Sequence, residues 1–167
     1  MLGLMQNHQL MISSLIEFAE RHHGEGEIVS RRVEGDIHRY TYKDVGRRAR
    51  QVANALDGMK LESGSRVATL AWNGYRHLEL YFGVSGSGRV IHTLNPRLHP
   101  DQIAWIIRHA EDRVIFVDLT FVPILEEILT HCPSVEHVIV FTDSHHMTPF
   151  QMRGVPTLTW KGAHTYE

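Results

Sequence analysis

Cysteine, net charge and long apolar stretches are all scarce in this sequence of 167 residues. The single cysteine, Cys132, cannot form an internal disulfide, so nothing here supports a secreted, disulfide-stabilised fold. Seventeen Lys and Arg oppose nineteen Asp and Glu, a formal charge of −2 that gives no reason to expect a nucleic-acid partner. No stretch is apolar for long enough to cross a bilayer, and residues 1–11 lack the pattern of a signal peptide. We therefore expect a cytoplasmic protein.

Histidine is the one residue type in excess, with thirteen copies. Two pairs are adjacent in sequence, His22-His23 and His145-His146, whereas two ligands on one helix face need a spacing of three or four. A metal site also needs three or four converging ligands. We expect these histidines to lie on the surface and predict no metal site.

The N-terminal third predicts a helix, a hairpin and a second helix. Apolar residues recur at helical spacing over 12–19, with Ser13 and Ser14 as caps. Two strand-like runs, 27–33 and 37–42, flank a Glu-Gly-Asp turn, which indicates a hairpin.

The second helix is predicted from a capping signal and an apolar stripe. Thr41 and Asp44 have the spacing of a relaxed capping box, and the stripe continues to Leu56. Three arginines lie off this stripe: Arg47, Arg48 and Arg50. Such a run either binds an anion or forms a solvated face, and the second interpretation is favoured.

From Arg66 onward, strands and helices alternate. The expected strands cover 66–71, 90–93, 114–117 and 138–141. Asn73 is placed to cap one intervening helix, and Pro100 to begin another. This order indicates an α/β fold with a mostly parallel sheet flanked by helices, preceded by the N-terminal β-hairpin.

Two glycine patterns resemble nucleotide-binding motifs but fail the tests for them. Gly83-x-x-Gly86-x-Gly88 follows a helix and precedes a strand, the reverse of a dinucleotide fingerprint, so a close-packed turn is favoured. No Gly-Lys-Ser or Gly-Lys-Thr occurs, and Arg89 is the nearest cation. The long side chain of Arg89 either changes the local packing or points to solvent.

Two polar positions follow predicted strands at their carboxyl ends. Asp118 ends a buried strand, but without two further carboxylates it favours a capping or turn role over a metal site. Asn95 and Arg97 lie in an Asn-Pro-Arg loop, where they offer hydrogen bonds and a planar fork for a carboxylate or phosphate. The competing interpretation is a rigid turn in which Arg97 pairs with a structural acid.

Several segments in order resemble the opening of the adenylate-forming (acyl-CoA synthetase) superfamily. These segments are 40–42, 47–49, 53–56, 64–68, 79–82, 86–88, 92–98, 117–118 and 133–135. The Thr-Leu-Asn-Pro-Arg-Leu run at 93–98 resembles the fatty-acid–CoA ligase branch. The resemblance covers nearly the whole region from Ile12 to Asp143.

The resemblance implies a division of the chain and a reaction. Residues 1–143 would be the N-terminal α/β subdomain, and 144–167 an irregular segment that leads to the catalytic region. The full-length enzyme would use ATP, Mg²⁺ and coenzyme A to activate a fatty acid. Asn95 and Arg97 would lie near the acyl and coenzyme A cleft.

The same resemblance implies limits. The family's phosphate loop with its lysine, its ribose-binding acid and its C-terminal lysine have no counterpart here, so no catalytic residue is assigned. We expect this chain alone to be inactive and to bind none of these cofactors. A homodimer through the hairpin surface, Arg39 and Tyr40 included, is a further expectation. The alternative is a free-standing binding or dimerisation module. An enzyme fragment, unlike a free-standing module, should expose apolar surface where the missing region packs.

Overall fold

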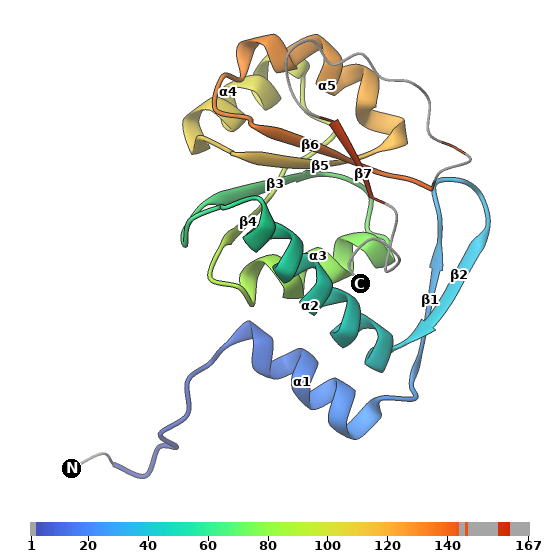
Figure 1. The fold of residues 1–167 in the computed structure, drawn as a ribbon, viewed down its shortest axis with the longest axis vertical. Helices are drawn as coiled ribbons and strands as arrows, with labels where there is room; N and C mark the ends of the chain where they lie inside the picture. Colours follow the sequence, from blue (N-terminus) through green and yellow to red (C-terminus); the bar gives the residue numbers. More distant parts are fainter. Residues whose placement is uncertain (1–2, 144–145, 147–156, 161–167) are drawn as a thin grey trace.

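The computed structural model describes residues 3–143 and 146, and the backbone of 157–160. Figure 1 shows a sheet between two layers of helices, with a separate hairpin and a first helix beside them. The elements are α1 Ile12–His23, β1 Glu27–Arg31, β2 Ile37–Thr41, α2 Tyr42–Gly58, β3 Arg66–Leu70, α3 Tyr75–Ser85, β4 Val90–Thr93, α4 Pro100–Ala110, β5 Val114–Asp118, η1 Leu119–Phe121, α5 Val122–Ile128, η2 Leu129–His131, β6 His137–Phe141 and β7 Thr157–Trp160. The predicted fold class is confirmed.

The main sheet has the order β4-β3-β5-β6-β7, and every neighbouring pair is parallel. Strand β7 was not expected, because residues 144–167 are predicted to be irregular. Thr157–Trp160 instead pairs along β6, from Val138↔Thr157 to Phe141↔Trp160. The run Thr-Leu-Thr-Trp consists of residues common in strands, so its intrinsic preference agrees with this pairing. The proposed domain boundary at residue 143 stays a prediction.

Each face of the sheet is covered by its own pair of helices (Figure 1). On one face, Ile103 and Ile107 of α4 and Leu125 of α5 pack in a core with Leu70. On the other, α2 and α3 contribute Val52 and Leu80. Strand β5 lies between the two cores and is buried along its whole length, as the continuous apolar run predicts.

The hairpin and the start of α2 follow the predicted local signals. Strands β1 and β2 pair antiparallel, from Glu27↔Thr41 to Arg31↔Ile37. At α2, the Thr41 side chain accepts from the Asp44 amide while the Asp44 carboxylate accepts from the Thr41 amide, a complete capping box.

Two predicted caps are wrong. Helix α1 begins after Met11 without a side-chain cap, and the Ser14 hydroxyl donates to the Met11 carbonyl instead. Helix α3 begins after Gly74, so Asn73 lies one position too early to cap it. A cap depends on the backbone angles of one residue, which the type of side chain alone does not determine.

The predicted solvated face of α2 is wrong at one of its three arginines. Arg48 is buried, and its Nε donates to Oε1 of Glu79 on α3 over 2.6 Å. Glu79 is fully buried, and this burial raises its pKa although Arg48 acts in the opposite direction. Arg47 and Arg50 are exposed and pair with Asp44 and Glu20. One member of the run therefore joins the helices, and the other two are solvated as expected.

Helices α2 and α3 approach closely at Gly83. A Cβ built at Gly83 would lie 2.6 Å from Cβ of Val52 and 2.7 Å from the carbonyl oxygen of Ala49. This glycine therefore serves helix packing rather than phosphate binding. Further along, Gly88 adopts a φ of 76° in the turn before β4. The predicted turn is confirmed at Gly86 and Gly88, whereas Gly83 lies inside α3.

Replacing Arg48 with Met should destabilise the fold by about 3–5 kcal/mol, because it leaves the buried Glu79 carboxylate without its partner. The double change Arg48→Met and Glu79→Leu should recover much of that loss, since it removes both charges of this pair from the interior. Urea denaturation of the three chains measures both effects. Arg47→Met, which breaks an exposed pair, is the control and should cost no more than about 1 kcal/mol. A double variant less stable than the single one would contradict this account.

Replacing Gly83 with Ala should destabilise the fold by about 1–3 kcal/mol, because the added methyl group overlaps Val52 and the α2 backbone. The matched control is Gly58→Ala in α2, where a Cβ meets nothing within 4 Å. That change should be neutral or stabilise by up to about 1 kcal/mol. Thermal unfolding of the two variants compares them directly, and equal effects would show that close helix packing is not the cause.

Candidate functional site

The strand order places a topological switch point between β3 and β5. After β3 the chain passes to β4 at one edge of the sheet, and after β5 it passes to β6 on the other side. In open α/β sheets, ligands bind beyond the carboxyl ends of the strands at such a point. The residues that follow β3 and β5 therefore define the first place to search for a site.

Trp72 and Asp118 meet at this switch point. The Trp72 amide donates to Oδ2 of Asp118 over 2.6 Å, which ties the loop after β3 to the end of β5. Asp118 is 5% exposed, and burial raises its pKa to about 6 although the Trp72 amide and the charge of Arg76 lower it. The predicted helix-capping role is wrong, because the carboxylate makes no cap bond at η1. The carboxylate accepts instead from the loop that follows the neighbouring strand β3.

Sequence reasoning missed Trp72. Its indole is 44% exposed and leans on Phe121, with 4.9 Å between the ring centroids. The available signal was its position, directly beyond the first parallel strand, where loops at a switch point begin. Trp72 thus forms a half-exposed aromatic surface at the carboxyl edge of the sheet. Asp118 holds its backbone, and Phe121 contacts its indole ring.

The hairpin tip closes another part of the same edge. Arg76 of α3 donates to Oε1 of Glu34 over 2.9 Å and to the Phe141 carbonyl at the end of β6 over 3.2 Å. Arg32, before the turn, pairs with Asp36 and lies 3.6 Å from Asp143. Among the described residues, a small cavity of about 40 Å³ lies between the tip and the sheet. The hairpin tip therefore covers part of the crevice beyond β5 and β6.

Asn95 and Arg97 lie beyond β4, one strand away from the switch point. The Asn95 side-chain oxygen accepts a hydrogen bond from the Arg97 amide over 3.0 Å. This hydrogen bond folds the loop into a tight turn. Both residues are exposed. Among the described residues, no acid pairs with the Arg97 guanidinium, so the alternative of a structural ion pair gains no support. Their place near an acyl or coenzyme A cleft stays a prediction.

Arg89 packs within the fold and does not point to solvent. It is 8% exposed, and its Nη2 donates to Asp57 over 2.7 Å and to the Leu61 carbonyl over 2.8 Å. The guanidinium thus ties the end of α2 to the start of β4. The predicted alternative in which Arg89 points to solvent is therefore wrong.

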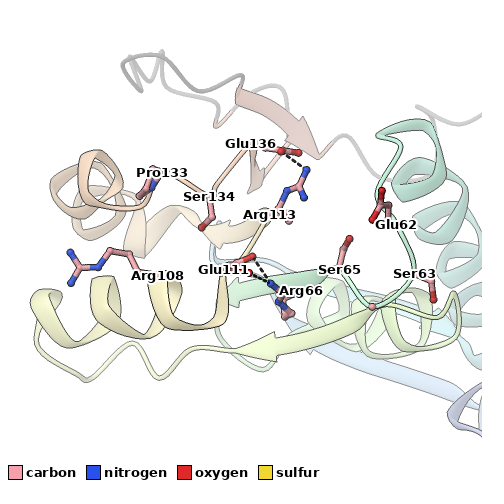
Figure 2. Close-up of a pocket in the computed structure, with 11 residues that line it drawn as sticks. Glu62, Ser63, Ser65, Arg66, Arg108, Glu111, Arg113, Pro133, Ser134 and Glu136 are labelled. Atoms are coloured by element: carbon pink, nitrogen blue, oxygen red, sulfur yellow. Dashed lines mark hydrogen bonds and ion pairs between the residues drawn. The ribbon is translucent and has the colours of Figure 1, made fainter.

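A broad hollow of about 880 Å³ lies at the opposite, amino edge of the sheet. Figure 2 shows that two of its arginines are already paired, Arg66 with Glu111 and Arg113 with Glu136. Arg66 also donates to the Ala110 carbonyl at the end of α4. Helices end here, and their carbonyl groups disfavour an anion. The arginines compensate these helix ends, so the hollow is better explained by the fold than by a ligand.

Metal and membrane features can be checked only where the structure describes the chain. In that part, no three His, Cys, Asp or Glu side chains gather closely enough to hold a metal ion. His145 of the second histidine pair lies outside it. None of the described helices has the length and apolar character that crossing a membrane requires.

Comparison with known proteins identifies the family. The model of the family described as AMP-binding enzyme matches residues 15–156. The chain belongs to this family. It is 46% identical over 155 residues to a medium-chain-fatty-acid–CoA ligase of Ectopseudomonas oleovorans, covering 93% of this chain and 28% of that protein. It is 42% identical over 139 residues to a long-chain-fatty-acid–CoA ligase of Thermus thermophilus, covering 83% and 26%.

Solved structures of AMP-binding enzymes share the fold. A putative long-chain-fatty-acid CoA ligase from Rhodopseudomonas palustris superposes with a TM-score of 0.70 at 22% identity, over 83% of this chain and 34% of that one. The anthranilate CoA ligase AuaEII has a TM-score of 0.60 at 30% identity, over 62% and 20%. The chain spans about a quarter of the length of the curated ligases it matches. It therefore corresponds to the N-terminal region of acyl-CoA ligases.

Replacing Asp118 with Asn in this AMP-binding family member should stabilise the fold at pH 8 by about 1–3 kcal/mol and leave it unchanged at pH 4. The pKa of Asp118 in the folded chain, about 6, lies above the usual aspartate value of 3.8. Its contribution to stability is therefore complete below pH 4 and is lost as the pH rises through 6. Asn keeps an oxygen that can accept from the Trp72 amide without the buried charge.

Urea denaturation at the two pH values measures this difference. Asp101→Asn is the control, since the Asp101 side chain is 92% exposed and its surface pair with His99 should contribute no more than about 1 kcal/mol. A loss of stability on Asp118→Asn at pH 8 would show that the charge itself supports the fold, contrary to the burial argument.

Proposed function

We propose that the protein acts as the N-terminal part of an ATP-dependent fatty acyl-CoA synthetase. The observation that carries the proposal is the match to the AMP-binding family together with 46% identity to a medium-chain-fatty-acid–CoA ligase. The 3-methylmercaptopropionyl-CoA ligase of Ruegeria pomeroyi, 48% identical over 84% of this chain and 26% of that protein, widens the class to other carboxylic acids. The names of these relatives share one reaction, the activation of a carboxylate as its coenzyme A thioester.

The proposed reaction has two steps. The substrate carboxylate attacks the α-phosphate of ATP, which forms an acyl-adenylate and releases pyrophosphate. The thiol of coenzyme A then attacks the acyl carbon, which forms the thioester and releases AMP. Mg²⁺ would accompany ATP and screen its negative charge. A cytoplasmic location belongs to the same proposal.

The chain's own share of this reaction is to shape one side of the substrate cleft. The exposed loop of Asn95 and Arg97 supplies an amide and a guanidinium suited to an anionic substrate group. Large apolar side chains are also exposed, among them Trp72 and Trp105. Their exposure supports the expectation that a further region packs here, and we propose that the isolated chain is inactive.

A free-standing binding or dimerisation module is the second proposal, and α1 favours it. Ile12, Leu15 and Phe18 of this helix are 47%, 60% and 58% exposed. Of the two hairpin residues expected at such a contact, Tyr40 is buried, whereas Arg39 is exposed and paired with Glu27. If a homodimer forms, we propose that the apolar face of α1 contributes to the contact.

Replacing Arg97 with Ala in the full-length ligase should raise the KM for the acid or for coenzyme A about tenfold, a loss of about 1.4 kcal/mol of binding energy. Arg97→Lys should recover only part, because it keeps the charge without the planar fork. Steady-state kinetics with each substrate varied separately measures this effect. The matched control is Arg108→Ala, another exposed arginine that lies at the opposite edge. Unchanged kinetics for Arg97→Ala would remove this loop from the cleft.

A further inference from the structure

A histidine and a buried aspartate join the two ends of the segment that contains the Asn95 and Arg97 loop. His92 lies on β4 and Asp112 in the turn between α4 and β5, so the loop and the whole of α4 lie between them in the chain. Nδ1 of His92 is 2.9 Å from each carboxylate oxygen of Asp112. The pair therefore closes the segment 92–112 on itself.

The Asp112 carboxylate depends on this contact. Asp112 is fully buried, and in the part of the chain that the structure describes no other side chain donates to its carboxylate. A buried carboxylate is costly without an opposite charge, so the imidazolium form of His92 compensates it better than the neutral form. Nδ1 can keep its hydrogen toward Asp112 in both forms, and the proton that is gained or lost is then on Nε2. Because the His92 side chain is 27% exposed, solvent can exchange that proton.

The carboxyl end of β4 lies at an edge of the main sheet, next to the loop. Among the described strands, β4 pairs with β3 alone. The Leu94 amide donates to the Thr69 carbonyl over 2.9 Å, and the Leu94 side chain packs in the core on the α4 side. The Asn95 and Arg97 loop follows directly. A weaker contact at His92 therefore affects the Leu94 hydrogen bond and the loop behind it.

Asp112 is the charged group that controls the protonation of His92. His92 lies on the α4 side of β4, because its register partner Ala68 belongs to that core. The hydrogen bond to Asp112 and the charge of its carboxylate raise the pKa of His92, although burial acts in the opposite direction. Among the described residues, no ionisable side chain of the adjoining elements adds to this shift. Those side chains are Arg66 on β3, His77 on α3 across the sheet, Arg108 and His109 on α4, Glu111 in the turn and Cys132 after α5.

The contact between His92 and Asp112 is therefore linked to pH. Its contribution to stability is complete below the usual histidine value of 6.5 and is lost as the pH rises through the raised pKa of His92. We propose that the pair is a pH-dependent switch that holds the end of β4 and the Asn95 and Arg97 loop while His92 is protonated. When the imidazole loses its proton, the buried carboxylate loses its counter-charge, and the end of the strand opens more often. The switch concerns the order of the loop and does not depend on the ligase proposal.

Hydrogen exchange of the 167-residue chain at pH 6 and pH 9 tests the switch without ATP or coenzyme A. The quantity to compare is the protection factor of the Leu94 amide, which removes the effect of pH on the chemical exchange rate. It should fall about fivefold at pH 9 relative to that of Ile115 in the central strand β5. Ile115 controls for a change in the stability of the whole fold. An unchanged ratio in the unmodified chain would overturn the proposal.

His92→Asn keeps a neutral donor near the position of Nδ1 but cannot become charged, so the relative protection of Leu94 should be low and equal at both pH values. Asp112→Asn should also remove the pH dependence, and an NMR titration should show a lower pKa for His92 than in the unmodified chain. The matched control is His99→Asn, at an exposed histidine that caps α4, where Asn also serves as a cap. This control should keep the fivefold change. The proposal is overturned if His92→Asn keeps it as well.

Discussion

The buried guanidinium of Arg76 joins the three parts of the described structure. It lies on α3, binds Glu34 at the hairpin tip and reaches the Phe141 carbonyl at the end of β6. Its charge also lies over the ring of Tyr75, which stacks on His38 of the hairpin at 3.8 Å. A buried cation without these partners would be costly, so the hairpin, the helix and the sheet hold their positions together. A second buried pair, Arg48 with Glu79, fixes α2 to α3 by the same principle.

This arrangement decides where the chain can meet a ligand. The hairpin tip covers the carboxyl ends of β5 and β6, next to the switch point between β3 and β5 where an open α/β sheet usually binds a ligand. What stays open is the aromatic surface of Trp72, the exposed loop after β4 and an apolar groove between β1 and α3. Such a unit is better suited to contact a substrate or a further region through these surfaces than to enclose a reacting substrate. That agrees with a chain that matches about a quarter of the length of known CoA ligases.

The sequence predicts those features that depend on local pattern. Alternating strands and helices determine the parallel sheet, and the Thr41 and Asp44 spacing determines the start of α2. The sequence does not predict contacts between residues that are far apart in the chain, such as Arg48 and Glu79. A run of arginines on a helix predicts a solvent-exposed face. The sequence does not show that the fold places an acid opposite one of them. Trp72 was missed for the same reason, since its importance comes from Asp118 on another strand.

Native-state hydrogen exchange on the 167-residue chain tests most directly whether the hairpin and the sheet form one cooperative unit. The amides of β2 and β5 are the informative pair, since they lie on the two sides of the Arg76 contacts. We predict the same free energy of opening for both strands, because the hairpin cannot detach from the sheet without exposing the buried Arg76 guanidinium. Opening of β2 at a free energy several kcal/mol below that of β5 would contradict it, and would show that the hairpin is held only loosely.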